Sequence, residues 1–207
     1  MKHLPNILTA LRLVLSLFVF LALATAGGGP LSDPGAGFAL VRWAFVAFAV
    51  AAVTDFFDGW LARRYGAMSV AGAILDPIAD KVLVCAAILG LMTLTKSLVF
   101  AVPAGLILFR EFAVSALREV AAGRGVKLPV TWLAKWKTTL QLVALGALMI
   151  LAGWPAFGLP SDQALFADAA LVALALWWIA CLVTLITGAQ YGAQAGRALS
   201  KPQPASR

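Results

Sequence analysis

The sequence is poor in charged residues. Only 12% of its 207 residues are charged, whereas 62% are apolar and the mean hydropathy is +0.94. A soluble core of this length would not need so much apolar surface, so the composition disfavours a soluble domain. Apolar runs of about 20 residues recur along the chain, which is the length that a helix needs to cross the hydrocarbon of a bilayer. We therefore expect an all-α integral membrane protein.

Cysteine and acidic residues are also scarce. The two cysteines, Cys85 and Cys181, both lie inside apolar runs, which favours small buried residues over a disulfide or a metal pair. Nine acidic residues face sixteen basic ones, for a net charge of +7. In a membrane protein this excess indicates loop orientation and contact with anionic lipid headgroups, so we expect membrane lipids and no nucleic acid as partners.

The apolar runs predict six transmembrane helices, near residues 7–26, 38–61, 72–95, 98–122, 130–151 and 164–191. Clusters of Gly and Pro separate several of them. The first run resembles a signal peptide in its basic start and small-residue end, but Arg12 interrupts it, and we expect a retained span. Residues 1–196 are expected to form one catalytic membrane domain, followed by a mobile polar tail, 197–207.

Most basic residues fall at one set of predicted helix ends. Only Arg42 and Lys96 lie towards the other set. By the positive-inside rule, both termini, residues 55–81 and the loop 119–137 face the cytoplasm, and the protein belongs to the cytoplasmic membrane.

Four aspartates stand between two apolar runs. Asp55 and Asp58 are three residues apart, and Asp76 and Asp80 are four apart, so each pair shares one face of a helix. A short connection joins the pairs, and we expect them to converge. Four carboxylates would repel one another unless a cation kept them ionised, and such oxygen ligands suit Mg²⁺, Mn²⁺ or Ca²⁺. A carboxylate that is not needed to hold the cation could act as a base.

Plainer interpretations exist for this segment. Arg63, Arg64 and Lys81 could neutralise the aspartates at a solvated helix end, although that explains four ordered aspartates poorly. Gly59 and Ala62 could leave room for a bulky ligand or could equally be helix-packing residues.

The segment reads D-G-x-x-A-R-x8-G-x3-D-x3-D, with Asp55 three positions ahead of it. This pattern resembles the signature of the CDP-alcohol phosphotransferases, and no position departs from it. The resemblance implies a six-helix, usually homodimeric membrane enzyme. Such an enzyme moves a phosphatidyl or phospho-alcohol group from a CDP-linked donor to an acceptor hydroxyl and releases CMP.

The resemblance also implies roles for individual residues. Asp55, Asp58 and Asp76 would hold two divalent cations, Mg²⁺ or Mn²⁺, and Asp80 would take the acceptor's proton while also contacting metal. The residues expected around the CDP donor come from the motif and from the first span, where "NILTALR" also resembles the family: Asn6, Thr9, Arg12, Gly59, Ala62, Arg63 and Gly72.

A second set of residues indicates which kind of acceptor the enzyme would use. Arg110 and Arg118 lie about 80° apart on the fourth predicted helix, with Ser115 between them. Lys135, Lys137 and Thr138 start the fifth, where the two lysines point opposite ways, so one of them is expected to reach the site. Such a cluster would suit an anionic acceptor such as a phosphate monoester. The alternative is ordinary positive-inside charge, with the arginines paired to Glu111 and Glu119.

These segments resemble the phosphatidylglycerophosphate synthase branch of the family. That resemblance implies CDP-diacylglycerol as donor, glycerol 3-phosphate as acceptor, and phosphatidylglycerophosphate and CMP as products. Acceptors such as inositol phosphate, serine or phosphatidylglycerol stay open, although serine would not need a phosphate cage. A non-enzymatic transporter is a remote alternative. Transport should spread polar residues through the bilayer midplane, whereas here they lie at one interface.

Overall fold

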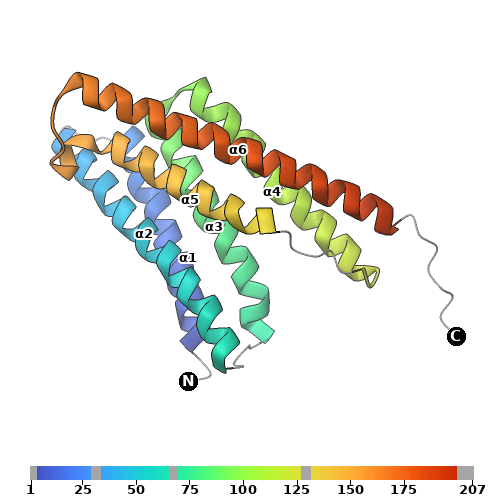
Figure 1. Cartoon of the computed structure of the whole chain (residues 1–207). Helices are drawn as coiled ribbons and strands as arrows, with labels where there is room; N and C mark the ends of the chain where they lie inside the picture. Colours follow the sequence, from blue (N-terminus) through green and yellow to red (C-terminus); the bar gives the residue numbers. More distant parts are fainter. Residues whose placement is uncertain (1–3, 29–33, 66–69, 127–131, 200–207) are drawn as a thin grey trace, which may run out of the picture.

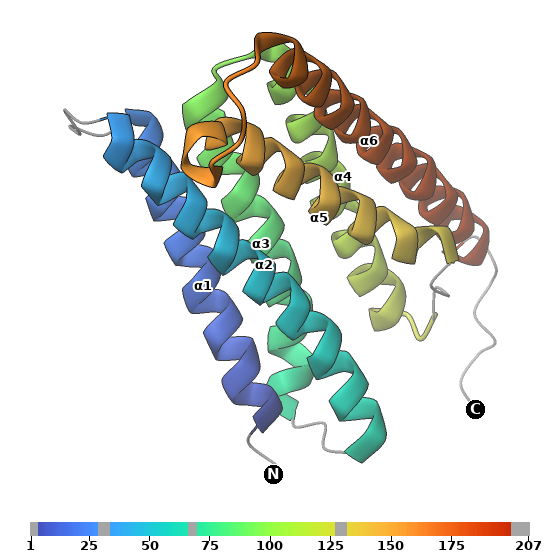
Figure 2. The ribbon, with the colours of Figure 1, turned by 60° about the vertical axis from the view of Figure 1, so that its left-hand side comes forward.

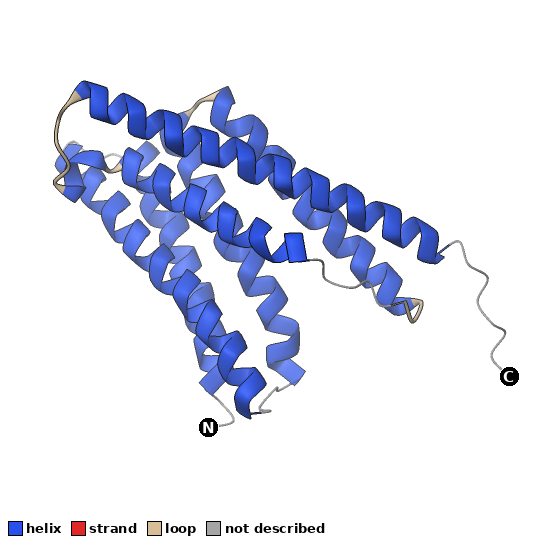
Figure 3. Cartoon of the chain, viewed as in Figure 1, coloured by secondary structure: helices blue, strands red, loops and turns tan. Residues whose placement is uncertain are grey.

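The structure is a computed structural model that describes residues 4–28, 34–65, 70–126 and 132–199; within these ranges the side chains of residues 4–6, 34, 56–65, 70–77, 80, 134, 135 and 199 are not described. The elements are, in chain order, α1 (Leu4–Gly28), α2 (Pro34–Tyr65), α3 (Val70–Thr95), α4 (Leu98–Gly123), α5 (Trp132–Ala152), the short 3-10 helix η1 (Trp154–Phe157) and α6 (Gln163–Leu199). The described ranges contain no strand (Figure 3). The all-α prediction is confirmed.

Each predicted span corresponds to one helix, because each apolar run is long and is bounded by residues that favour turns. The largest difference is at the end of α6, which continues to Leu199 rather than stopping near residue 191. Residues 197–199 of the expected tail therefore belong to a helix, and residues 200–207 lie outside the described part.

The helices have the length and composition of membrane-spanning segments. Four described stretches are long and apolar enough to cross a bilayer: Ile7–Gly28, Gly35–Asp55, Leu98–Gly123 and Gln163–Ala198. In α3 and α5 the described apolar stretches are shorter, Lys81–Thr95 and Trp136–Ala152. Many large apolar side chains are exposed on the helix surfaces, as expected where lipid is the solvent.

The six helices form two groups. α1 packs against α2 and α3, while α6 packs against α4 and α5, and α5 also contacts α2 and α3. Figures 1 and 2 show the groups close together at one end of the bundle and diverging at the other. Because consecutive helices run in opposite directions, the diverging end collects the starts of α1, α3 and α5 and the ends of α2, α4 and α6.

Small residues allow α1 and α3 to approach closely. A Cβ atom added to Gly90 on α3 would lie 2.7 Å from the Cβ of Leu23, and one added to Gly27 on α1 would lie 2.5 Å from the Thr93 hydroxyl oxygen. Real Cβ atoms essentially never come so near. Leu23 is fully buried in this contact. The pairing of these two helices therefore depends on glycine at position 90.

An aromatic pair joins α4 to α6. The rings of Phe100 and Trp177 stack with centroids 5.4 Å apart, and the Trp177 indole N–H donates to the Phe100 carbonyl oxygen over 3.2 Å. Cys181 is buried one turn further along α6. Cys85 on α3 is partly buried, and both cysteines are free thiols in the structure.

Candidate active site

The predicted site residues lie at the diverging end of the bundle. Asp55 lies in the last third of α2, Arg118 near the end of α4 and Lys137 near the start of α5. These positions are far apart in the sequence, and the alternating direction of the helices brings them to one end.

Arg12 and Asp55 form an ion pair between α1 and α2. Arg12 Nη1 lies 2.5 Å from Asp55 Oδ1; the arginine side chain is only 1% exposed, whereas the aspartate is 41% exposed. Thr9, one turn before Arg12 on α1, is fully buried. A buried guanidinium has a high desolvation cost, and the carboxylate offsets it. The sequence predicted separate roles for Arg12 and Asp55 and did not predict this contact.

The convergence of the four aspartates stays a prediction. Asp58 lies on α2, and Asp76 and Asp80 lie on α3, but their side chains are outside the described residues. Among the side chains that the structure does describe, no group of three or more His, Cys, Asp or Glu could hold a metal ion. The surroundings of five predicted donor-binding residues are likewise not described: Asn6, Gly59, Ala62, Arg63 and Gly72.

The four predicted aspartate ligands nevertheless have the chemistry that a hard divalent cation requires. All four residues are aspartates, and the described one, Asp55, has a partly exposed carboxylate that solvent can reach. Carboxylate oxygens are the ligands that Mg²⁺ and Mn²⁺ prefer. The residues present therefore fit such a cation by type.

A cavity of about 230 Å³ lies among α3, α4, α5 and α6. It brings together every described residue of the predicted acceptor cage: Arg110, Ser115, Arg118, Lys137 and Thr138. The sequence predicts this cage from basic residues and helical spacing, and two of its residues come from a different helix from the other three. Of the two lysines predicted to point apart, Lys137 reaches this cavity; the side chain of Lys135 is not described.

Glu111 is the centre of the contacts in this cavity. Its Oε1 accepts a hydrogen bond from the Lys137 ammonium group, lies 3.4 Å from Arg110 Nη1 and also 3.4 Å from Gln141 Nε2. Arg110 and Lys137 are both buried, with 7% and 6% of their surface exposed. The Glu111 carboxylate is thus shared by Arg110 and Lys137 and neutralises only one of their two positive charges. Because Arg118 and Lys81 also line the cavity, its lining has an excess of positive charge.

Sequence reasoning missed several residues that line this cavity, among them the charged or hydrogen-bonding residues Lys81, Glu111, Gln141 and Tyr191. Lys81 and Glu111 had been interpreted as neutralising partners. A signal for Gln141 existed, because it follows Lys137 by one helical turn on the same face of α5. No local signal marked Tyr191, whose ring centroid lies 5.9 Å from the Arg110 guanidinium carbon.

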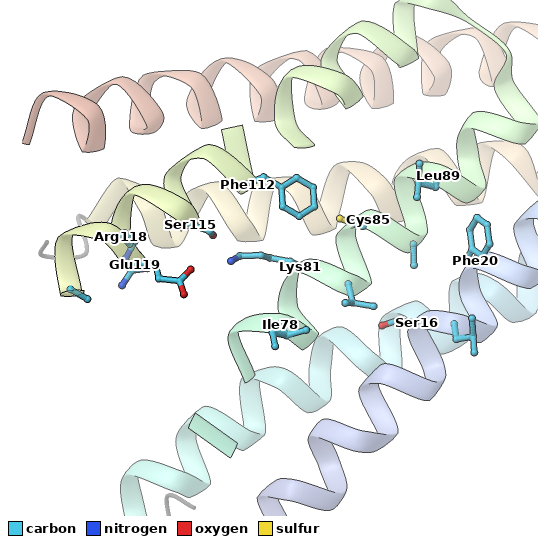
Figure 4. A pocket seen from close by; sticks show the side chains of 14 residues that line it. Ser16, Phe20, Ile78, Lys81, Cys85, Leu89, Phe112, Ser115, Arg118 and Glu119 are labelled. Atoms are coloured by element: carbon cyan, nitrogen blue, oxygen red, sulfur yellow. The ribbon is translucent and has the colours of Figure 1, made fainter. Parts of the chain in front are cut away.

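A larger cavity of about 1110 Å³ lies among α1, α3 and α4. Figure 4 shows Lys81 directed towards Ser115, Arg118 and Glu119 at its polar end. Much of the remaining lining is apolar: Leu17, Phe20, Ile78, Val82, Ala86, Leu89, Phe112 and Ala122. The two cavities share four lining residues, Lys81, Cys85, Ser115 and Arg118, and therefore adjoin. We call the smaller one, lined by Arg110, Arg118, Lys81 and Lys137, the cationic cavity.

The sequence is similar to those of known proteins. The sequence profile of the CDP-alcohol phosphatidyltransferase family matches residues 2–186. A CDP-diacylglycerol–glycerol-3-phosphate 3-phosphatidyltransferase of Rickettsia typhi is 39% identical over 192 residues, covering 92% of this chain and 96% of its own. A protein of the same name from Rickettsia bellii is 45% identical over 144 residues, covering 70% and 74%.

A probable phosphatidylglycerophosphate synthase of Mycobacterium tuberculosis is 43% identical over 195 residues, which covers 94% of this chain and 82% of its own. The family match takes in both predicted aspartate pairs, the Arg12–Asp55 ion pair and every residue that lines the cationic cavity except Tyr191. The chain belongs to the CDP-alcohol phosphatidyltransferase family.

Proposed function

We propose that this protein transfers the phosphatidyl group of CDP-diacylglycerol to the primary hydroxyl of glycerol 3-phosphate, giving phosphatidylglycerophosphate and CMP. The observation that carries the proposal is the cationic cavity beside the aspartate-bearing start of α3. Lys81 lines that cavity and directly follows Asp80 in the chain. The names of the similar proteins support the same donor and acceptor.

The cavity supports an acceptor that carries a phosphate. Arg110 and Arg118 present guanidinium groups, which bind phosphate oxygens through paired, charge-assisted hydrogen bonds. Lys137 and Lys81 add two ammonium groups, while Glu111 offsets one positive charge. Serine has no phosphate group that could bind to these cations.

In the proposed reaction the acceptor's primary hydroxyl oxygen attacks the phosphorus that bears diacylglycerol. A P–O bond forms to the acceptor, the P–O bond to CMP breaks, and Asp80 takes the hydroxyl proton. Asp55, Asp58, Asp76 and Asp80 would hold two divalent cations, Mg²⁺ or Mn²⁺. When bound, these cations supply positive charge for the donor pyrophosphate and for the departing CMP.

The remaining residues bind and orient the donor. Arg12 is held by Asp55 near the nucleotide, and the larger cavity supplies an apolar wall beside the polar site. The site faces the cytoplasm in the cytoplasmic membrane, because most basic residues belong to the same end of the bundle. The enzyme is expected to be a homodimer.

An acceptor panel tests the proposal. Purified protein with CDP-diacylglycerol and Mg²⁺ or Mn²⁺ is given glycerol 3-phosphate, inositol phosphate, serine or phosphatidylglycerol, and CMP release is measured. Glycerol 3-phosphate should give the highest kcat/KM, and chelation of the metal should abolish release in a way that added Mg²⁺ or Mn²⁺ reverses. A clear preference for another acceptor would contradict the assignment.

A further inference from the structure

Arg110 is held in the cavity by helix α6. Its Nη2 donates a hydrogen bond to the Thr187 hydroxyl oxygen over 2.8 Å, and Thr187 is fully buried. Thr187 lies outside the lining of the cationic cavity, so this contact is made behind the surface that an acceptor would touch. The contact joins residues that are 77 positions apart in the sequence.

The Thr187 hydroxyl is oriented to accept this hydrogen bond. A threonine hydroxyl has one proton, and that of Thr187 is donated to the Thr184 carbonyl oxygen over 2.9 Å. The lone pairs of the hydroxyl oxygen are left for Arg110. Hydrogen bonds from a charged donor are stronger than neutral ones, so this one resists rotation of the guanidinium group.

The adjacent residue, Gly188, makes room for the arginine. A Cβ atom at this position would lie 2.8 Å from Arg110 Cγ and 3.1 Å from its Nε. The arginine stem therefore lies against the backbone of α6, and any side chain at position 188 would displace it. Tyr191, one turn further on, lies beside the guanidinium group.

A second link from α6 reaches the other buried cation. The Thr184 hydroxyl donates to the Ala180 carbonyl oxygen over 2.6 Å and accepts from Gln141 Nε2 over 2.8 Å. Gln141 in turn lies 3.4 Å from Glu111, which accepts the hydrogen bond of Lys137. Thr184 and Thr187, one turn apart on the same face of α6, thus support both cations of the cavity from behind.

We propose that Thr187 and Gly188 are positioning residues that set the affinity of the cavity for the acceptor's phosphate by holding Arg110 in its binding orientation. The proposal rests on the function proposed above and assigns part of the acceptor specificity to α6, a helix in which the sequence predicted no site residue. The competing explanation is that both residues serve only the packing of α4 against α6.

Kinetics of Thr187→Val and Thr187→Ser distinguish the two explanations. Valine keeps the shape but removes the hydrogen-bond acceptor, whereas serine keeps it. We expect Thr187→Val to raise the KM for glycerol 3-phosphate about tenfold, the cost of one charge-assisted hydrogen bond, with the KM for CDP-diacylglycerol within about twofold of wild type. Thr187→Ser should restore most of the affinity. A matched control is Thr25→Val, because the Thr25 hydroxyl bonds only its own helix, to Leu21, in the described part.

Gly188→Ala provides a second, independent variant. Its control is Gly192→Ala on the same helix, where an added Cβ meets nothing within 4 Å. Gly188→Ala should raise the KM for glycerol 3-phosphate selectively, while Gly192→Ala should behave as wild type. Equal increases in both KM values, a fall in kcat alone, or a Thr187→Ser variant as impaired as Thr187→Val would overturn the proposal.

The failure of this proposal can be told apart from failure of the proposed function. If the wild-type protein prefers another phosphate monoester, the same variants are measured with that acceptor, and selective loss of its affinity still supports the role of α6. If the wild type uses glycerol 3-phosphate but the variants show no selectivity, only the positioning role is wrong. A wild type that uses only unphosphorylated acceptors overturns both.

Discussion

The guanidinium group of Arg12 on α1 pairs with the carboxylate of Asp55 on α2, with 2.5 Å between Nη1 and Oδ1. The pair connects the first helix to the first of the four aspartates. Because Arg12 is almost completely buried, the two helices cannot separate here without exposing a charge to an apolar environment. The pair therefore has a structural consequence, and we expect a functional one because Asp55 is a predicted metal ligand.

Arg12→Ala should destabilise the protein by about 2 kcal/mol and lower its activity. The expected loss lies between those of a buried and a surface pair, because Asp55 is 41% exposed. Thermal unfolding in detergent and CMP release measure the two effects. Arg42→Ala is the matched control, since exposed Arg42 donates a hydrogen bond to the Ala156 carbonyl oxygen of η1 and lies over the Trp43 ring but forms no ion pair among the described contacts. If both variants unfold at the same temperature, the ion pair is not stabilising.

Asp80→Asn should lower kcat at least 100-fold, because the amide cannot accept the acceptor's proton. Binding of CDP-diacylglycerol should be largely retained, and its stabilisation of the purified protein against heat measures this. Asp168→Asn, at an exposed position near the start of α6, should leave turnover unchanged. Near-normal turnover of Asp80→Asn would rule out the base assignment.

Arg118→Ala should raise the KM for glycerol 3-phosphate at least tenfold and change the KM for CDP-diacylglycerol much less, because this guanidinium group lines the cationic cavity. Steady-state kinetics with each substrate varied in turn provide the measurement. Arg124→Ala, just beyond α4, serves as the control and should alter neither constant. Equal effects of Arg118→Ala on both substrates would argue against a phosphate cage.

Gly90→Ala should lower the free energy of unfolding by about 1–3 kcal/mol, because the new methyl group would overlap Leu23 on α1. Gly105→Ala on α4 meets nothing within 4 Å and should instead stabilise its helix by up to about 1 kcal/mol. Denaturation midpoints of the two variants are compared under identical detergent conditions. A Gly90→Ala protein as stable as Gly105→Ala would mean that α1 and α3 separate easily.

Much of the architecture could be predicted from local sequence. The positions of the six helices follow from apolar runs of bilayer length, and their antiparallel order follows from the short connections between them. The spacing of the aspartates and the family pattern predict the donor end of the site, and this stays a prediction because the side chains of Asp58, Asp76 and Asp80 are not described. The cage residues Arg110 and Arg118 could be selected because charge inside an apolar helix is costly and rarely lacks a function.

Only the tertiary structure could supply contacts between helices. Periodicity states which face of a helix a residue occupies but not which helix packs against that face, so the Arg12–Asp55 pair was not predictable. The same reason explains the central position of Glu111 and the support of Arg110 by Thr187 and Gly188. Threonine and glycine in an apolar helix are common, and their roles become visible only once a buried guanidinium group lies against them. Helix formation is a local property of the chain, whereas partner choice is decided by packing.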